Sequence, residues 1–406
     1  MVFSWFCFGV MSKGRVVFDG KQMSTGFDFI HKHPFISGSW FCRPPVRCFL
    51  FHLNCQFINK LFLVMIDLSS EKNIKLFSYN ELRAATDSFY LGNKIGHGGF
   101  GTVYKGILRN GTPIAVKVLS LQSKQGVNEF LTEIDVITNI KHPNLVQLIG
   151  CCVQDSNRIL VYEYVENSSL DRALLGSNSA KNNLNWEIRV AICVGVAKGL
   201  AYLHEGAGQQ IVHRDIKASN ILLDKRFLPK IGDFGLAKLF PDDVSHIITR
   251  VAGTNGYLAP EYAMQGQLTK KADIYSFGVL VLEIVCAKSS SKPYWSGTNK
   301  LLLEKAWELY EEGRLPELVD PSLGDYPQEE VLRYMKVALF CTQAKATRRP
   351  SMSQALHMLS KPTKLNEKEL TPPGVIQELK SVSSASPNSI PRFSSSPLTS
   401  TEMFPR

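Results

Sequence analysis

The chain has 406 residues, of which 44% are hydrophobic and 20% are charged. This composition provides at least one large buried core and excludes a fibrous or wholly disordered protein. Half of the net charge of +10 comes from residues 1–75, which carry nine Lys or Arg against four Asp or Glu. No stretch interleaves aromatic residues with Arg and Lys as nucleic-acid-binding modules do, so we expect no nucleic-acid partner.

Residues 1–75 form an N-terminal extension that we expect to be irregular, because it shows neither helical nor strand periodicity. Residues 48–66 are long and apolar enough to span a bilayer, but they include Asn54 and Lys60, which are costly in hydrocarbon. The extension can therefore contain a transmembrane or membrane-associating segment. Alternatively, translation starts at Met65 and residues 1–64 are not part of the functional product. The sequence alone does not choose, so membrane attachment stays open.

Nine cysteines are scattered along the chain, and none forms a CxxC pair. Those after residue 100 lie in apolar surroundings, which indicates buried, reduced thiols rather than disulfides or metal ligands. We therefore expect the main domain to work in a reducing, cytosolic compartment.

From Phe77 to about Leu359, apolar and polar residues alternate densely. "FSYNELRAATDSF" predicts a short helix, and "IGHGGFGTVYKGIL" predicts a strand, a Gly-rich turn and a second strand. "GVNEFLTEIDVITNI" has apolar residues at helical spacing, and after about residue 180 the pattern is mainly helical. A strand-rich first lobe should therefore meet a helical second lobe near residues 163–170.

The C-terminal residues 361–406 become rich in Ser and Pro, most clearly from about residue 381. Such a composition buries too little apolar surface to offset the entropy of ordering the chain. We expect this tail to be disordered.

The run "GHGGFG" at residues 96–101 has three readings. A dinucleotide fold uses GxGxxG but continues as a helix, whereas here Thr102–Tyr104 read as a strand. A glycine flap that brings backbone N–H groups to phosphates is the second reading, and a plain hairpin turn is the third.

Lys117 is the one cation in the apolar strand "PIAVKVL", and a buried ammonium needs an anion. Glu133 follows sixteen residues later on the amphipathic helix. Either residue alone is more often a solvated surface charge. Together they predict an ion pair that aims Lys117 at phosphates.

The segment "IVHRDIKASNILLD", residues 211–224, places polar residues between two apolar runs that read as buried strands. Asp215 is placed to accept the proton of an attacking hydroxyl, and Asn220 to hold Mg²⁺ through its amide oxygen. Asp233 in "GDFGLA" supplies the carboxylate that bridges metal and phosphates, and Lys217 can neutralise the transferring phosphoryl group.

These residues resemble the signature set of the protein kinases. The motifs that carry the resemblance are "GHGGFG", "IAVK", "HRDIKASN", "DFG" and "APE", in that order. "HPNLVQLIGCC", "LVYEYVENSSL" and "RVAGTNGYLAPEYA" look like plant receptor-like cytoplasmic kinases, particularly the cold-responsive protein kinase group. The resemblance covers about residues 76–380, while residues 1–64 match nothing in that group.

The resemblance implies an α+β, two-lobed kinase domain at residues 76–360, with the lobes at about 76–165 and 166–360. It implies ATP and Mg²⁺ as cofactors and protein substrates with Ser or Thr acceptors, since "HRDIK" with Thr254 is the serine/threonine pattern. The implied nucleotide-binding residues are Ile95, Gly96, Gly98, Gly99, Gly101, Val103, Ala115, Lys117, Tyr162, Glu163 and Val165.

Structural and regulatory residues are implied in the same way. Glu261 should pair with Arg349, and Asp273 should brace the backbone of the catalytic loop. Thr249 is the implied regulatory phosphorylation site, because Ile248 stands where many relatives have a Ser.

The regulatory partner of Thr249 is Arg214, next to Asp215. We expect Arg214 to lack a partner until a phosphate arrives in the activation segment.

Two rival functions remain: a pseudokinase that acts only by binding, and a small-molecule kinase of related fold. The complete candidate set disfavours the first, and the segment from Asp233 to Glu261, which shapes a protein-substrate groove, disfavours the second. No ligand-binding ectodomain is visible, so we expect an upstream membrane receptor or kinase. The expected location is the cytoplasm, including the cytoplasmic face of the plasma membrane.

Overall fold

The computed structural model describes the backbone of residues 11–12, 15–18 and 21–23, and then residues 74–374. Within the latter range it leaves out 99–100, 120–123, 139, 155–156, 177–183, 207, 242, 292–300 and 363. The chain divides into two compact units, Met1–Val64 and Met65–Arg406. The second unit contains every residue to which the sequence assigns a catalytic, nucleotide-binding, metal-binding, regulatory or structural role, although Gly99 lies outside the described residues.

The first unit contains a small antiparallel sheet of β1 (Met11–Ser12), β2 (Arg15–Phe18) and β3 (Lys21–Met23). The expectation of irregular structure is wrong for these residues, because the β-prone run "RVVF" pairs on both of its edges. The apolar stretch at 48–66 lies outside the described residues. Within the described part of the chain, no helix has the length and apolar character needed to cross a membrane.

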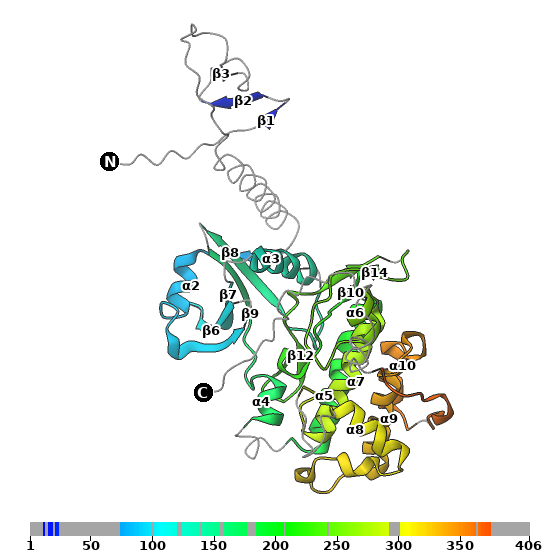
Figure 1. Cartoon of the computed structure of the whole chain (residues 1–406). Helices are drawn as coiled ribbons and strands as arrows, with labels where there is room; N and C mark the ends of the chain where they lie inside the picture. The colour runs from blue at the N-terminus through cyan, green and yellow to red at the C-terminus, as the bar shows by residue number, and fades with distance from the viewer. Residues whose placement is uncertain are drawn as a thin grey trace, which may run out of the picture. The chain divides into compact units, whose positions relative to one another are not determined.

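The first lobe of the second unit is built on a six-stranded sheet in the order β4-β8-β9-β7-β6-β5 (Figure 1). Its strands are β4 (Lys75–Leu76), β5 (Lys94–Gly98), β6 (Gly101–Ile107), β7 (Pro113–Leu119), β8 (Leu148–Gln154) and β9 (Asn157–Glu163). The hairpin of β5 and β6 lies at one edge and carries the glycine run.

The predicted helix before this hairpin is α2 (Tyr79–Ala85). The Ser78 side chain caps its first turn by accepting a hydrogen bond from the Glu81 N–H at 3.1 Å. The helix buries Leu82 in a core cluster with Ile114 and Val161 of the sheet. The second helix of the lobe, α3 (Lys124–Ile137), buries Phe130, Ile134 and Ile137 and carries Glu133.

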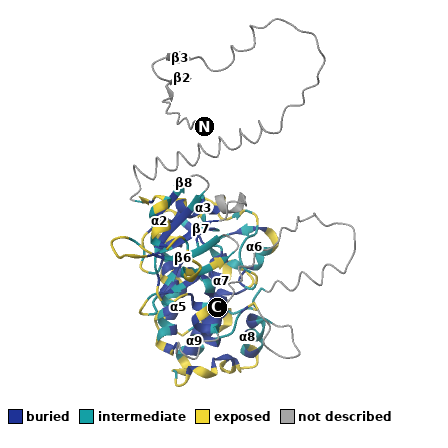
Figure 2. Cartoon of the chain, turned by 90° about the vertical axis from the view of Figure 1, so that its left-hand side faces the viewer, coloured by how far each residue is buried: buried dark blue, intermediate teal, exposed yellow. Residues whose placement is uncertain are grey.

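The second lobe is mainly helical, and it begins with α4 soon after β9 ends at Glu163, as expected. Its helices are α4 (Leu170–Leu175), α5 (Trp186–Ala201), α6 (Pro260–Gln265), α7 (Lys270–Cys286), α8 (Leu302–Glu311), α9 (Gln328–Cys341) and α10 (Met352–Ser360). Helix α7 is buried from Ala272 to Cys286, and α5, α8 and α9 pack against it (Figure 2).

Short helical turns join these elements. They are η1 (Leu91–Asn93), η3 (Tyr202–Gly206), η4 (Ala218–Asn220), η5 (Leu315–Leu318), η6 (Pro321–Leu323), η7 (Ala346–Arg348) and η8 (Glu367–Glu369).

Three short strand pairs hold loops of the second lobe. They are β10 (Gln210–Val212) with β13 (Lys238–Phe240), β11 (Ile221–Leu223) with β12 (Pro229–Ile231), and β14 (Ile247–Ile248) with β15 (Gln267–Leu268). Because β10 and β11 flank residues 213–220, both ends of that polar loop are fixed, as the two apolar runs predict.

The expectation of a disordered tail from residue 361 is wrong for its first part. Residues 361–374, apart from 363, return across the second lobe and are hydrogen-bonded to it, with a bridge between Gln343 and Pro373. A segment with three prolines loses less entropy on ordering, so a few hydrogen bonds suffice to bind it. Residues 375–406 lie outside the described part of the chain.

Candidate active site

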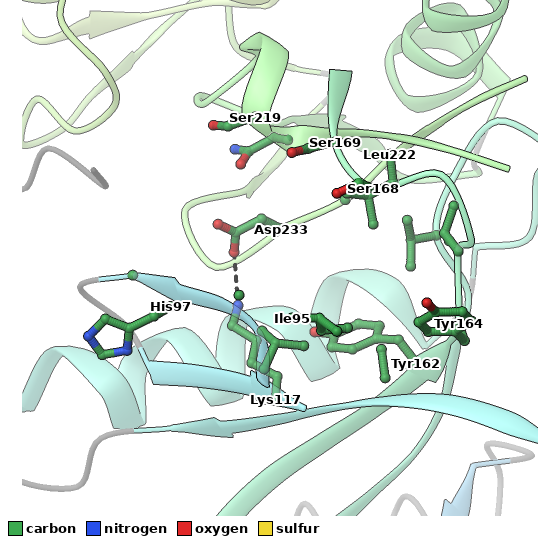
Figure 3. Close-up of a pocket in the computed structure, with 18 of the residues that line it drawn as sticks. Ile95, His97, Lys117, Tyr162, Tyr164, Ser168, Ser169, Ser219, Leu222 and Asp233 are labelled. Carbon is green, nitrogen blue, oxygen red and sulfur yellow. Dashed lines mark hydrogen bonds and ion pairs between the residues drawn. The ribbon is translucent and has the colours of Figure 1, made fainter. Parts of the chain in front are cut away.

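A cavity of about 370 Å³ lies between the two lobes (Figure 3). The nucleotide-binding candidates that line it are Ile95, Gly96, Gly98, Gly101, Val103, Ala115, Lys117, Tyr162, Glu163 and Val165. Asn220 and Asp233 line it from the second lobe. Sequence reasoning missed further lining residues, among them His97, Val146, Ser169 and Leu222, because single residues of these types carry no sequence pattern that signals a cavity.

Lys117 lies at the inner end of this cavity on β7 and is only 9% exposed. Its Nζ is 2.8 Å from Asp233 Oδ1 and also pairs with the carboxylate of Glu133 on α3. Figure 3 shows Lys117 and Asp233 pointing toward each other. Burial alone would lower the pKa of Lys117, but the two carboxylates raise it well above its usual value, so the ammonium stays charged.

Asp215 is buried in the loop between β10 and β11. Its Oδ1 accepts a hydrogen bond from the Thr254 hydroxyl at 2.7 Å, and its Oδ2 lies 2.9 Å from Lys217 Nζ. Lys217 Nζ also donates to Thr254 Oγ1 at 2.8 Å. A carboxylate and an ammonium therefore hold one hydroxyl between them.

The side chain of Asn220 is oriented by Asp215. Its Nδ2 donates to the Asp215 carbonyl oxygen at 2.9 Å and to Oδ2 at 3.0 Å, which leaves the amide oxygen for a ligand. Asp233 has φ +62° and uses Oδ1 for Lys117, which leaves Oδ2. Two oxygens of this kind suit a hard divalent cation that takes its other ligands from phosphates and water.

The charge of Asp233 is also favourable for a cation. Burial alone would raise its pKa, but Lys117, Lys217 and His213 hold the pKa below the usual value. The carboxylate is therefore ionised at neutral pH. No group of three or more His, Cys, Asp or Glu side chains that could hold a metal ion occurs within the described residues, so a cation here depends on these few oxygens.

Asp273 on α7 holds the backbone of the loop that carries Asp215. Its carboxylate accepts hydrogen bonds from the N–H groups of His213 and Arg214, both at 2.8 Å. Arg214 has φ +72°, a left-handed conformation that costs free energy in a non-glycine residue and needs such support. Burial would raise the pKa of Asp273, but hydrogen bonds from His204 and the His213 backbone, with the charges of both histidines, keep it below its usual value.

Comparison with known proteins agrees with this geometry. The family model for protein tyrosine and serine/threonine kinases matches residues 89–359. This chain belongs to that protein kinase family. Cold-responsive protein kinase 1 of Arabidopsis thaliana is 53% identical over 315 residues, which cover 77% of this chain and 81% of that protein.

Two probable LRR receptor-like serine/threonine-protein kinases of Arabidopsis thaliana, At1g56130 and At3g14840, are 53% and 52% identical. The matches cover 70% and 75% of this chain but only 27% and 30% of those proteins. The chain is thus a serine/threonine protein kinase with plant receptor-like relatives. The family uses ATP and a divalent metal.

The kinase anchors the end of its activation segment through Glu261. Arg349 Nη1 and Nη2 lie 2.7 and 2.8 Å from the two oxygens of Glu261. Arg349 is 1% exposed, and a bidentate pair of this kind is among the stronger side-chain contacts. The pairing expected from the sequence is present.

The expectation that Arg214 lacks a partner is wrong for this structure of the kinase. Its Nε donates to the Tyr262 hydroxyl at 3.0 Å, Nη1 to the Leu236 carbonyl at 3.0 Å and Nη2 to the Arg250 carbonyl at 2.8 Å. Neutral oxygens therefore take up the guanidinium donors. Sequence reasoning missed Tyr262, whose only signal is that it follows "APE".

Proposed function

We propose that this kinase is catalytically active and transfers the γ-phosphoryl group of Mg-ATP to Ser and Thr hydroxyls of proteins. One observation carries the proposal. The Thr254 hydroxyl lies within hydrogen-bond distance of Asp215 and Lys217, which supports the binding of a substrate alcohol by this pair of side chains. A substrate hydroxyl that replaces Thr254 at this position would have its proton beside a carboxylate.

In this proposal Asp215 accepts the proton of the attacking hydroxyl, and Lys217 offsets the charge of the transferring group. Lys117, oriented by Glu133, binds the phosphates. The backbone of Glu163 and Val165 binds adenine beside Tyr162. The Glu163 side chain is held by other partners, because it accepts a hydrogen bond from the Gln147 N–H at 2.8 Å and pairs with Lys230 at 2.9 Å. The proposed contact with adenine therefore uses the backbone of Glu163 and not its carboxylate.

The divalent ion would be held by the free oxygens of Asn220 and Asp233, and when bound it neutralises the phosphate charge. We propose Mg²⁺ because both groups are hard oxygen donors and few in number, which suits an ion that keeps several water ligands. The glycines at 96, 98, 99 and 101 would bring backbone N–H groups to the phosphates, as the phosphate-flap reading predicts.

We further propose that phosphorylation of Thr249 activates the kinase. Thr249 precedes Arg250, whose carbonyl oxygen accepts from Arg214 at 2.8 Å. A phosphate on Thr249 would lie near this guanidinium and replace a neutral acceptor with a charged one. The upstream partner would be a membrane receptor or kinase, in line with the names of the receptor-like relatives.

The proposed location is the cytoplasm, including the inner face of the plasma membrane. It is supported by Cys151, Cys152, Cys193, Cys286 and Cys341, which are buried free thiols.

The test of activity is transfer of labelled phosphate from ATP to a generic protein substrate by the full chain. The Asp215→Asn variant keeps the size of the side chain and removes its basicity. Transfer by the wild-type chain and loss in the variant are expected. Equal background incorporation by both chains would instead identify a pseudokinase that acts by binding.

A further inference from the structure

Residues 361–374, here called the strap, lie C-terminal to α10 and outside the residues that the kinase family model matches (Figure 1, orange). The strap begins on α9, where Arg333 donates to the Lys361 carbonyl. Lys336 lies 2.5 Å from Glu367, which also accepts from the Tyr310 hydroxyl at 3.1 Å. The strap is therefore bound to the second lobe along its length.

The end of the strap binds the turn between α9 and α10. The Thr371 hydroxyl donates to Gln343 Oε1 at 3.0 Å, and the Ala344 N–H donates to the Pro372 carbonyl at 3.3 Å. The last described residue, Gly374, accepts from the Tyr275 hydroxyl at 2.8 Å. Its backbone lies so close to Pro260, at the start of α6, that a Cβ on Gly374 would clash with the proline ring.

The strap holds the same two residues that position Arg349. The Gln343 carbonyl accepts from Arg349 Nε at 2.8 Å, and the Ala344 carbonyl accepts from Nη2 at 3.2 Å. Arg349 in turn binds Glu261, the anchor of the activation segment. A continuous series of hydrogen bonds therefore links Thr371 to Glu261.

The contact of Thr371 depends on its hydroxyl being a donor. Gln343 is 1% exposed, and its Nε2 is already committed to the carbonyls of Phe340 at 3.3 Å and Arg348 at 3.0 Å. The amide cannot turn to offer Nε2 to the strap without breaking both bonds. Any group on Thr371 that only accepts hydrogen bonds would thus face the amide oxygen.

We propose that Thr371 is a phosphorylation site and that its modification releases the strap from the Gln343–Ala344 turn. Thr371 is directly followed by the exposed Pro372, so it suits a serine/threonine kinase that requires proline after its target residue. The Thr371 O–H bond breaks, its oxygen bonds to the γ-phosphorus of ATP, ADP leaves, and the proton passes to the base of the modifying kinase.

The phosphorylated side chain carries only acceptor oxygens and about two negative charges at neutral pH. Both features oppose contact with Gln343 Oε1. The strap can present Thr371 to an enzyme because its end contains no helix or extended ladder and opens locally by breaking few hydrogen bonds.

The test uses the full chain with Asp215→Asn, so that the kinase cannot phosphorylate itself and the readout does not depend on the proposed function. The other Ser or Thr residues that precede proline, Thr112, Ser386 and Ser396, are changed to Ala. A proline-directed kinase and ATP are added, and mass spectrometry locates the phosphate. A peptide of residues 365–380 shows that the added kinase accepts the motif.

Amide hydrogen exchange is then measured at residues 343–349 and 260–265. We expect phosphate on Thr371 and exchange about tenfold faster in both segments, the factor expected from losing one net hydrogen bond. Thr371→Ser should behave as the wild type does, and Thr371→Val should show no change on treatment. Modification of the peptide but not of the folded chain, or modification with unchanged or slower exchange, would overturn the proposal.

Discussion

The Tyr262 hydroxyl is hydrogen-bonded to the Arg214 guanidinium and links the catalytic loop to the activation segment. It receives Arg214 Nε at 3.0 Å and the Ala252 N–H at 3.0 Å, and it donates to the Arg250 carbonyl at 3.1 Å. Tyr262 is 1% exposed, so these bonds are shielded from water. The side chain of Arg214, the residue before Asp215, is therefore held in place by neutral groups before any phosphate is added.

Tyr262→Phe should lower kcat about tenfold, because it leaves buried donors of Arg214 and Ala252 without their acceptor, at a cost of about 1–3 kcal/mol. The KM for ATP should change little, since Tyr262 does not line the nucleotide cavity. Steady-state kinetics with a peptide substrate checks this. Tyr90→Phe, at a residue 60% exposed, is the matched control. A variant with normal kcat would show that the hydroxyl does not position Arg214.

Thr249→Ala should lower activity strongly, and mass spectrometry of the active wild-type enzyme should find phosphate on Thr249, added in trans. The physical reason is the charge-assisted bonding that a phosphate offers to Arg214 in place of the Arg250 carbonyl. Ser245→Ala is the control. Full activity of Thr249→Ala, or an active enzyme with no phosphate on residues 245–254, would contradict this switch.

Lys117→Met and Asp233→Asn should each reduce phosphoryl transfer by more than about a hundredfold, the scale of losing one preorganised electrostatic group. Neither change removes core volume, so circular dichroism should show a retained fold. The Lys141→Met variant, at an exposed residue, controls for loss of a surface charge. Near wild-type activity in either site variant would disprove the assignment of these two residues.

Glu283 predicts a pH dependence of stability. It is fully buried on α7 and accepts from the Tyr257 hydroxyl and from the Ser290 N–H. Burial raises its pKa from 4.5 to about 7, although these hydrogen bonds oppose the shift, and the charge of Asp171 adds to it. Between about pH 4.5 and pH 7 the folded state therefore binds one more proton than the unfolded state.

The contribution of Glu283 to stability is thus fully present below about pH 4.5 and is lost as the pH rises through about 7. Glu283→Gln keeps an acceptor oxygen and cannot titrate. Its free energy of unfolding, relative to the wild type, should increase over this pH range by up to about 3 kcal/mol, at 1.36 kcal/mol per pKa unit. Denaturant unfolding at several pH values tests this, with the exposed Glu329→Gln as control. A constant difference between variant and wild type would refute it.

A chain that begins at Met65 should keep its specific activity, because the compact second unit starts there and the kinase family match starts at residue 89. If acylation of Cys42, Cys48 or Cys55 attaches the protein to a membrane, this truncation should also move it out of the membrane fraction. Insoluble or inactive protein would indicate that residues 1–64 take part in folding. Cys42, Cys48 and Cys55 lie outside the described residues.

The sequence by itself determined the local framework of the site. Asp215 and Asn220 are five residues apart between two apolar strands, so both belong to one short loop whose ends are fixed. The short helix α2 and the mainly helical pattern after about residue 180 were predicted from local sequence, which depends on neighbours within a few residues. Lys117 and Glu133 were predicted as a pair because a buried ammonium needs a carboxylate.

Only the tertiary structure decided which distant polar groups meet. Arg214 and Tyr262 are 48 residues apart, and a tyrosine in an apolar run has the same sequence pattern whether its hydroxyl binds a guanidinium or faces water. The strap shows the same limit, since it belongs to a C-terminal tail whose composition predicts disorder, yet Thr371 bonds to Gln343, 28 residues away. Composition measures how much apolar surface a segment can bury, whereas these contacts depend on buried donors and acceptors that only the packed helices bring into position.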